Sequence, residues 1–483
     1  MRTSAQHEES ASPPGPGHGS SGIKICVNTQ TPLVQFIAKS QNGAISRQTV
    51  WTGGDGVADL ASMTEDVDYR FSPGGVTRMV YPLMRRMQNE GLAGDVHWVS
   101  LNRYGPETVR AGGIVLRHVT LGTERLAGYG KVKETIWGAV HGTGIDLGEA
   151  QDVFWSDDYA EYAYYNRLTA EVIAQLDKEQ DFDVFYVHDF QQLPIGHMLG
   201  TLKPKLFRWH VPFEESMIPD RWKPLLASYF NSYDIVIVST SKYMASLKSF
   251  GFTGKARRVF PYVDPADYGK PTAKEISALC QKLQIQRRDK VALVVARLDP
   301  MKGQDRAVRA LASVSREFPA LKLVIVGNGS FSSSGEGLGL TKAGKFMKEL
   351  ETLAKKLRVQ DRVIFAGHLS QKELDAIYER CDFCILPSVR EGFGLVVIES
   401  WLHHKACLVT ERAGAAELLV AGRNSPLFNP DDVDELGRKM ARLLADDGAR
   451  RDLARAGFAK SRQCTLEVGA REESNAIAEL VGG

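Results

Sequence analysis

Long hydrophobic runs are missing from this chain of 483 residues. No apolar segment approaches the roughly 20 residues that a membrane-spanning helix needs, so we expect no integral membrane segment. Residues 1–21 also lack an apolar core and are rich in Ser, Pro, Gly, His and Glu. We therefore expect a disordered tail there, not a signal peptide, and predict a cytoplasmic protein.

The chain also has few cysteines and a net charge close to zero. The spacing of the 6 Cys is not that of a disulfide framework, which favours a reducing compartment over a disulfide-stabilised fold. Cys381 and Cys384 have the spacing of a redox pair, but they lie in an apolar, strand-like run and should act as small core hydrophobes. The net charge of +2 gives no argument for a nucleic acid or a membrane surface as partner, so we expect small-molecule partners and leave a homo-oligomer open.

Apolar residues are ample, at 43%, so the chain can bury large cores, and its 483 residues are enough for two or three domains of ordinary size. Strand-like runs alternate with helical ones over 22–268 and again over 269–460, on either side of a polar stretch at Asp264–Lys274. Such alternation predicts parallel sheets with helices on both faces. We therefore predict an α/β protein of two doubly wound, Rossmann-like domains facing a cleft. We expect a C-terminal helix at 461–483 and leave open whether it crosses back to the first domain.

The individual elements follow from hydrophobic periodicity. We expect strands at 22–28, 33–38, 97–101, 184–188, 205–211, 235–239, 258–261, 291–296, 322–326, 363–366, 381–386 and 406–410. We expect helices at 76–89, 159–178, 304–318, 345–357, 395–404 and from 431 onward. The Gly/Ser-rich residues 331–345 predict a mobile loop, and Ser370 with Glu373 predicts a capping box.

The most informative stretch is 387–399, where two carboxylates, Glu391 and Glu399, flank a glycine turn between a strand and a helix. Open α/β sheets bind ligands at the carboxyl ends of their strands, where this turn lies. Gly392 and Gly394 let backbone N–H groups approach an anion at the helix start, where the helix dipole favours negative charge. An anion site beside two acceptors for hydroxyl groups suggests a nucleotide sugar.

Two cations stand in a second strand-end segment, 295–303. Arg297 follows a strand and Lys302 precedes a helix, so both should point into the cleft that receives Glu391. Fixed cations stabilise the charge that grows on a departing diphosphate. A third strand ends in Gly327-Asn328-Gly329.

The N-terminal half places polar groups at the ends of its own strands. Gly74 and Gly75 open a helix and provide a place for phosphate or sugar hydroxyls, although a simple turn explains them equally well. Asp189 follows one strand, and His210 follows another. His210 could instead be a core histidine whose hydrogen bonds are satisfied.

Residues 285–432 resemble the donor half of retaining glycosyltransferases of the GT-B fold, the family that contains sucrose synthases and bacterial glycosyltransferases. The resemblance rests on Arg297-x4-Lys302-Gly303, Gly327-Asn328-Gly329 and Glu391-x7-Glu399. It implies that Arg297 and Lys302 hold the donor diphosphate, that Glu391 contacts the donor sugar, and that Glu399 contacts the ribose. It also implies that the backbone of the following residues faces the sugar and phosphates: Gly392, Phe393, Gly394 and Leu395.

The N-terminal half resembles trehalose-6-phosphate synthases. The shared segments are Val187-His188-Asp189-Phe190, Trp209-His210-Val211-Pro212-Phe213 and Ile136-Trp137-Gly138-Ala139-Val140-His141. The resemblance implies that His210 contacts the 6-hydroxyl of the donor sugar and that Asp189, Tyr129 and Trp137 contact the acceptor. Tyr129 and Trp137 could equally be core residues, as aromatic side chains usually are.

Two departures from that second family leave the acceptor open. Glu391 stands where the family typically has Asp, before a different turn, and Glu214 follows Phe213 where a second Pro is expected. The acceptor is therefore either a sugar or polyol or a sugar phosphate.

The combined resemblance implies a metal-independent hexosyltransferase that retains anomeric configuration and uses a nucleotide diphosphate sugar such as UDP-glucose, with no cofactor. Trehalose biosynthesis is the leading hypothesis. We assign no Asp-x-Asp metal motif at the carboxyl end of an expected strand, and Arg297 with Lys302 would replace the metal. Three alternatives stay open: a transferase that builds a glucan or surface glycan, a nucleotide-sugar epimerase of the same fold, and a non-catalytic sensor.

Overall fold

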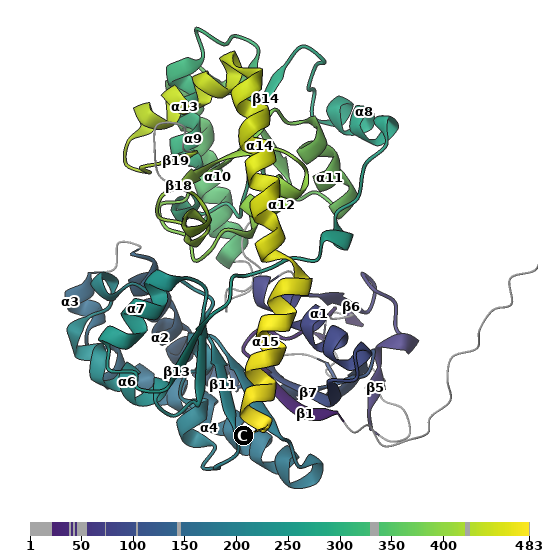
Figure 1. Cartoon of the computed structure of the whole chain (residues 1–483), viewed down its shortest axis with the longest axis vertical. Coiled ribbons are helices and arrows are strands. Elements are labelled where there is room, and N and C mark those ends of the chain that lie inside the picture. The colour runs from purple at the N-terminus through teal and green to yellow at the C-terminus, as the bar shows by residue number, and fades with distance from the viewer. Residues whose placement is uncertain are drawn as a thin grey trace, which may run out of the picture.

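The computed structural model describes residues 22–37, 40–41, 44–45, 56–72, 74–102, 105–142, 146–328, 338–420 and 426–482. The predicted tail at 1–21 lies outside these residues. Two large sheets, one from each half of the chain, lie one above the other along the long axis (Figure 1).

In its described part, the N-terminal half forms a nine-stranded sheet in the order β13-β12-β11-β10-β1-β7-β9-β8-β5. Four of its strands are β1 (Ile23–Thr29), β10 (Val184–His188), β11 (Lys205–Arg208) and β12 (Ile235–Val238). The remaining strands are β5 (Ala58–Asp59), β7 (Ala93–Leu101), β8 (Thr108–Ala111), β9 (Ile114–Val119) and β13 (Lys255–Arg258). Neighbouring strands are parallel except for β8 and β9, which form an antiparallel hairpin.

Two apolar cores cover the two faces of this sheet, because successive strand residues point to opposite faces. Every residue of β10 and β12 is buried, as expected for strands enclosed on both sides. One face packs against α2 (Thr123–His141) and α4 (Asp157–Gln180), and the other against α1 (Gly75–Asn89). Shorter helices complete this half: α3 (Leu147–Ala150), α5 (Ile195–Met198), α6 (Lys223–Phe230) and α7 (Ser241–Ser249).

The C-terminal sheet is parallel throughout its described strands, in the order β16-β15-β14-β17-β18-β19. Its strands are β14 (Lys290–Val295), β15 (Leu321–Val326), β16 (Val363–Gly367), β17 (Phe383–Leu386), β18 (Ala406–Thr410) and β19 (Leu427–Phe428). Its helices are α8 (Ala273–Lys282), α9 (Gln304–Val314), α10 (Leu338–Lys356), α11 (Gln371–Arg380), α12 (Leu395–Leu402), α13 (Val433–Ala445) and α14 (Asp447–Ser461). Each βα connection therefore delivers its loop to the same edge of the sheet.

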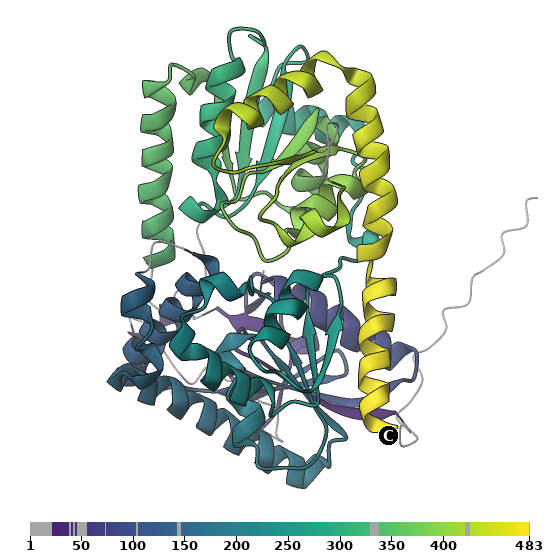
Figure 2. The same ribbon diagram turned by 60° about the vertical axis from the view of Figure 1, so that its left-hand side comes forward.

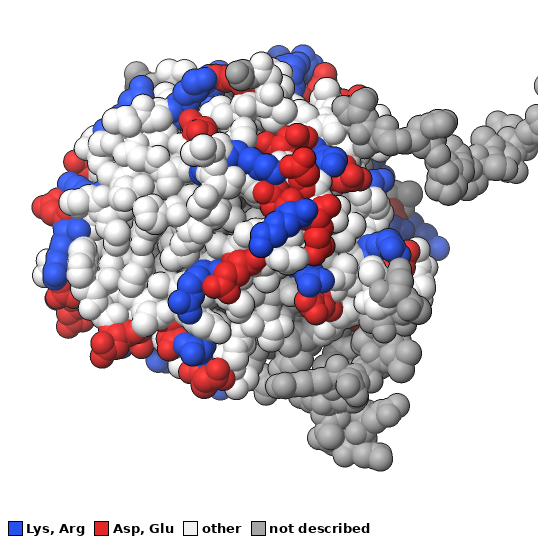
Figure 3. Space-filling model, turned by 90° about the horizontal axis from the view of Figure 1, so that it is seen from below, with Lys and Arg blue, Asp and Glu red and all other residues white. Residues whose placement is uncertain are grey.

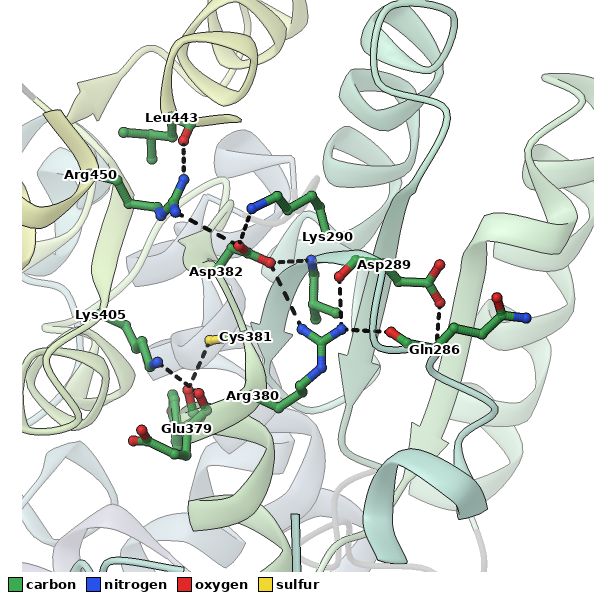
Figure 4. Close-up of polar contacts among 12 residues, drawn as sticks. Gln286, Asp289, Lys290, Glu379, Arg380, Cys381, Asp382, Lys405, Leu443 and Arg450 are labelled. Carbon is green, nitrogen blue, oxygen red and sulfur yellow. Dashed lines mark hydrogen bonds and ion pairs between the residues drawn. The ribbon is translucent and has the colours of Figure 1, made fainter. Parts of the chain in front are cut away.

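Asp382 fixes the amino end of β17 (Figure 4). Its carboxylate accepts the backbone N–H of Val291 at 2.8 Å and the Lys290 ammonium at 3.2 Å. Arg380 and Arg450 lie 3.9 and 3.8 Å away. This network joins β17 to β14 at the edge of the sheet opposite the loops after Val295 and Leu386, so its role is structural.

The last helix crosses back to the first half of the chain. After α14, helix α15 (Leu466–Val481) leaves the C-terminal sheet and lies against α1 and β10 (Figures 1 and 2). Buried Glu473 of α15 forms an ion pair with Arg208 of β11 and accepts a hydrogen bond from Tyr186 of β10. The C-terminal end of the chain is therefore part of the N-terminal core.

The predicted α/β fold with parallel, doubly wound sheets is confirmed, whereas several element predictions were wrong. The strand expected at 258–261 lies three residues earlier, as β13, and the strand expected at 33–38 is a short one, β2 (Val34–Phe36), outside the main sheet. Helix α10 begins at Leu338, inside the predicted loop 331–345, whose first seven residues lie outside the described part. The predicted capping box of Ser370 and Glu373 is present, and Cys381 and Cys384 are buried, with sulfurs 3.7 Å apart.

The surface shows no field of a single sign on the face seen from below, where acidic and basic side chains alternate beside a broad uncharged area (Figure 3). Elsewhere in the structure, Lys255 and Arg257 both pair with Glu479. Within the described residues, no helix combines the length and the apolar character needed to cross a bilayer.

Candidate functional site

Lys302 and Glu391 form the centre of the candidate site. The Lys302 ammonium lies 2.7 Å from a Glu391 carboxylate oxygen, and the Ser388 hydroxyl donates to the same oxygen at 3.2 Å. Burial alone would raise the pKa of Glu391, but the Lys302 cation and these hydrogen bonds bring it below its ordinary value. The pair is therefore a charged one, held between the loops that follow β14 and β17.

A glycine permits the close approach of these two loops. Gly303 has a φ of 68° and ends the short 3-10 turn Pro300–Lys302. A Cβ at this position would lie 1.9 Å from the carbonyl oxygen of Pro387. Only glycine fits both the left-handed backbone and the contact.

Arg297 is exposed just beyond the end of β14, and its backbone carbonyl accepts a hydrogen bond from Gln304 at 2.6 Å. Gly327, at the end of β15, has a φ of 131° and would place a Cβ 2.1 Å from the carbonyl oxygen of Ala296. Gly327 thus lets β15 pack against the backbone that presents Arg297. The structure brings Arg297, Lys302 and Glu391 to one edge of the C-terminal sheet, as predicted.

The turn at Gly392–Leu395 contacts the N-terminal half directly. The Gly392 carbonyl accepts a hydrogen bond from Tyr243 at 3.0 Å, and a Cβ on Gly392 would lie 2.9 Å from the His210 carbonyl oxygen. Phe393 is buried, and Gly394, with a φ of 97°, precedes the first residue of α12, Leu395. The backbone of this turn therefore starts the helix at the junction of the two halves.

Glu399 is buried within α12, and both of its carboxylate oxygens already have phenol partners. Tyr268 donates to one oxygen at 3.2 Å, and Tyr378 donates to the other at 3.0 Å. Arg78, from the first turn of α1, lies 3.8 Å from the first oxygen. The predicted Gly74–Gly75 helix start therefore lies near Glu399. The predicted ribose contact of Glu399 stays a prediction that would require one of these partners to move.

Asp189, His188 and His210 meet at the carboxyl ends of β10 and β11. His188 Nδ1 lies 3.1 Å from His210 Nε2, and Asp189 accepts the backbone N–H of Phe190 at 3.1 Å. Asp189 has a φ of 67° and a ψ of 166°, a region that non-glycine residues rarely occupy and that is found at functional sites. Burial raises the pKa of Asp189 to about 7. Burial, together with the Arg208 cation, lowers the pKa of both histidines, which are therefore neutral.

The two predicted aromatic residues of α2 are in different surroundings. Tyr129 is only 1% exposed and packs between Tyr162 and Tyr165, so its burial does not favour the predicted contact with an acceptor. Trp137 is partly buried and stacks on His141, with ring centroids 4.1 Å apart. Only Trp137 of this pair lies at the end of α2 that approaches the Glu391 loop.

Three residues near the site had no role assigned to them from the sequence. Glu214, where a second Pro was expected, forms an ion pair with Arg390 at 2.6 Å and thereby joins the two halves beside Glu391. His141 is the last residue of α2, and the charges of Lys302 and Glu391 both influence the pKa of its ring. The Pro-to-Glu departure was the signal for Glu214. His141 closed a segment shared with the second family and Arg390 preceded Glu391, but neither residue had a role assigned to it.

Among the described residues, no group of three or more His, Cys, Asp or Glu side chains is arranged to hold a metal ion. The predicted metal independence stays a prediction.

Comparisons with known proteins match both halves of the chain. Residues 276–460 match the family described as Glycosyl transferases group 1, and residues 146–245 match the family described as Trehalose synthase, N-terminal domain. A D-inositol 3-phosphate glycosyltransferase of Corynebacterium jeikeium is 28% identical over 56% of this chain and 65% of its own length. A mannosylfructose-phosphate synthase of Agrobacterium fabrum is 24% identical over 52% of this chain and 54% of its own length. The chain thus spans less than two-thirds of the length of these relatives.

Solved structures match over nearly the whole chain. An α,α-trehalose-phosphate synthase (UDP-forming) from Burkholderia xenovorans, in complex with glucose-6-phosphate, covers 94% of this chain and 100% of its own, with a TM-score of 0.71 and 16% identity. A sucrose-phosphate synthase from Thermosynechococcus elongatus covers 95% of this chain and 99% of its own, with a TM-score of 0.64 and 16% identity. The fold is GT-B, and the match of residues 276–460 to the Glycosyl transferases group 1 family agrees with the resemblance predicted from the motifs.

Proposed function

We propose that this chain is a retaining hexosyltransferase that moves glucose from a nucleotide diphosphate sugar to a small sugar, as in the synthesis of trehalose or trehalose phosphate. The observation that carries the proposal is the Lys302–Glu391 pair. This pair places a cation, and a carboxylate that can accept hydrogen bonds from sugar hydroxyls, at the carboxyl ends of the strands in the region that matches the Glycosyl transferases group 1 family. The match of residues 146–245 to the Trehalose synthase N-terminal family supports the choice of acceptor.

In this proposal, the donor diphosphate lies against Arg297 and Lys302. A phosphate oxygen replaces Glu391 as the acceptor of the hydrogen bond from the Lys302 ammonium. Glu391 can then accept a hydrogen bond from a hydroxyl of the donor sugar. The backbone N–H groups at the start of α12 add favourable partial charge. Because these groups are fixed before the reaction, they stabilise the charge that develops on the leaving diphosphate.

The acceptor approaches from the N-terminal half, past Asp189, His210 and Trp137. Its hydroxyl oxygen forms a bond to the anomeric carbon on the face from which the diphosphate departs, which retains the anomeric configuration. The electron pair of the broken bond goes to the diphosphate, and one of its oxygens takes the hydroxyl proton. Positioning supplies much of the rate enhancement in such a step. No resident metal ion is part of the proposal.

The test is release of nucleoside diphosphate from UDP-, ADP- and GDP-glucose and from GDP-mannose. Each donor is offered alone and with glucose, glucose 6-phosphate, glycerol 3-phosphate or a glucan. Release that depends on glucose or glucose 6-phosphate supports the proposal and decides whether the acceptor is phosphorylated. Release only with the glucan would favour a glycan-building transferase, and conversion of a donor without any acceptor would favour an epimerase.

A further inference from the structure

His141 is the last residue of α2, at the point where this helix meets the donor cluster of the other half. The next residue, Gly142, is left-handed, with a φ of 66°, and ends the helix. A Cβ on Gly142 would lie 3.7 Å from Nε of Arg390, the neighbour of Glu391. His141 is 8% exposed, and the charges of Lys302, Glu391 and Arg297 all act on its ring. His141 therefore belongs to the N-terminal half but lies beside the proposed donor site.

The orientation and tautomer of this ring are fixed. His141 Nδ1 lies 2.8 Å from the Trp137 carbonyl oxygen, and the ring stacks on the Trp137 indole at an interplanar angle of 26°. A carbonyl oxygen can only accept a hydrogen bond, so Nδ1 must carry the proton. The ring is neutral, because burial lowers the pKa of His141 to about 3. In the neutral ring, Nε2 then carries a lone pair and can only accept.

We propose that His141 is an acceptor-binding residue, whose Nε2 accepts a hydrogen bond from a hydroxyl of the acceptor sugar and so orients this sugar beside the Lys302–Glu391 pair. The inference rests on the proposed function and adds a residue that neither the motifs nor the comparisons assign. Its basis is the position of the ring between the Trp137 platform and the donor cluster.

His141 holds the hydroxyl without taking its proton. Efficient general bases have pKa values close to the working pH, and a ring with a pKa near 3 is too weak for this task. The proton therefore still goes to the leaving diphosphate when the new bond to the anomeric carbon forms. His141 starts and ends the step neutral.

Two substitutions separate the two nitrogens of the ring. His141→Asn places an amide near the position of Nδ1, which preserves a donor to the Trp137 carbonyl but removes the acceptor at Nε2. His141→Gln places an oxygen near the position of Nε2. A lost hydrogen bond between neutral groups corresponds to about a tenfold effect. We expect His141→Asn to raise KM for the acceptor about tenfold and His141→Gln to restore part of the loss. KM for the donor should stay within about twofold of wild type in both variants.

His118 provides a matched control. It is also buried, has a lowered pKa, and bonds a backbone carbonyl, that of Pro106, through Nδ1 at 2.7 Å. His118→Asn should leave the acceptor KM unchanged. Wild-type acceptor KM in His141→Asn, or a rise confined to the donor KM, would overturn the inference while the proposed function stands. A wild-type chain that transfers from no donor would overturn both.

Discussion

Removal of the Glu473 carboxylate should destabilise the protein far more than removal of any exposed acidic side chain of the same helix. Glu473 of α15 and Arg208 of β11 form an ion pair with both side chains 0% exposed. Glu473→Ala leaves the Arg208 guanidinium buried without a counter-charge and removes the acceptor of the Tyr186 hydroxyl. Breaking a buried ion pair from one side costs about 3–5 kcal/mol. We expect a loss of this size in the free energy of unfolding.

The assay is urea unfolding followed by far-UV circular dichroism, with Glu479→Ala as the matched control. Glu479 lies on the same helix and pairs with Lys255 and Arg257, but its side chain is 34% exposed. Exposed pairs contribute at most about 1 kcal/mol. A double variant, Arg208→Met with Glu473→Leu, should recover most of the loss, because apolar side chains often replace a buried pair without penalty. Equal effects of Glu473→Ala and Glu479→Ala would refute the reasoning.

Three further predictions concern the site. Lys302→Ala should lower kcat/KM about 100-fold, by analogy with the loss of one transition-state donor at roughly 3 kcal/mol; turnover close to wild type in steady-state assays would exclude the proposed role. Gly303→Ala should destabilise the C-terminal half in thermal unfolding, since the new Cβ would lie 1.9 Å from the Pro387 carbonyl oxygen, and a melting temperature equal to wild type would contradict this. The pKa of Asp189 is raised from 3.8 to about 7, so the folded protein binds this proton more tightly than the unfolded chain does. The associated stability is complete below about pH 4 and is lost as pH rises to about 7. Asp189→Asn should remove this decline, measured as unfolding free energies from pH 4 to 8, and a decline of equal size in the variant would count against the buried carboxyl as its cause.

Much of the fold could be predicted from the sequence because its central strands are almost wholly apolar and buried. Val184–His188 was predicted at its observed bounds, and β14, β15 and β18 agree within one residue or match. The β8–β9 hairpin was missed, since half-buried strands of four to six residues give weak periodicity. The start of α10 was misplaced because glycines at its beginning predicted a loop.

The site was predictable where a motif at a strand end marked it. The common position of Arg297, Lys302 and Glu391 was predicted in this way, since parallel strands bring their carboxyl ends to one edge. Contacts between the two halves were not predictable, because they depend on how the sheets face each other. The Glu214–Arg390 pair and the approach of His141 to the donor cluster are of this kind. Tyr129 lies in the core, which is one of the two alternatives that its aromatic side chain left open, and its contact with an acceptor stays a prediction.

The most direct test of the account is the proton NMR spectrum of the product formed from glucose and the preferred α-linked nucleotide diphosphate glucose. We expect a disaccharide, or its phosphate if glucose 6-phosphate is the acceptor, whose newly formed linkage has the α configuration of the donor. Its formation should persist in EDTA. A β-linked product would contradict retention, and a product that forms only after a divalent cation is added would contradict the role given to Arg297 and Lys302.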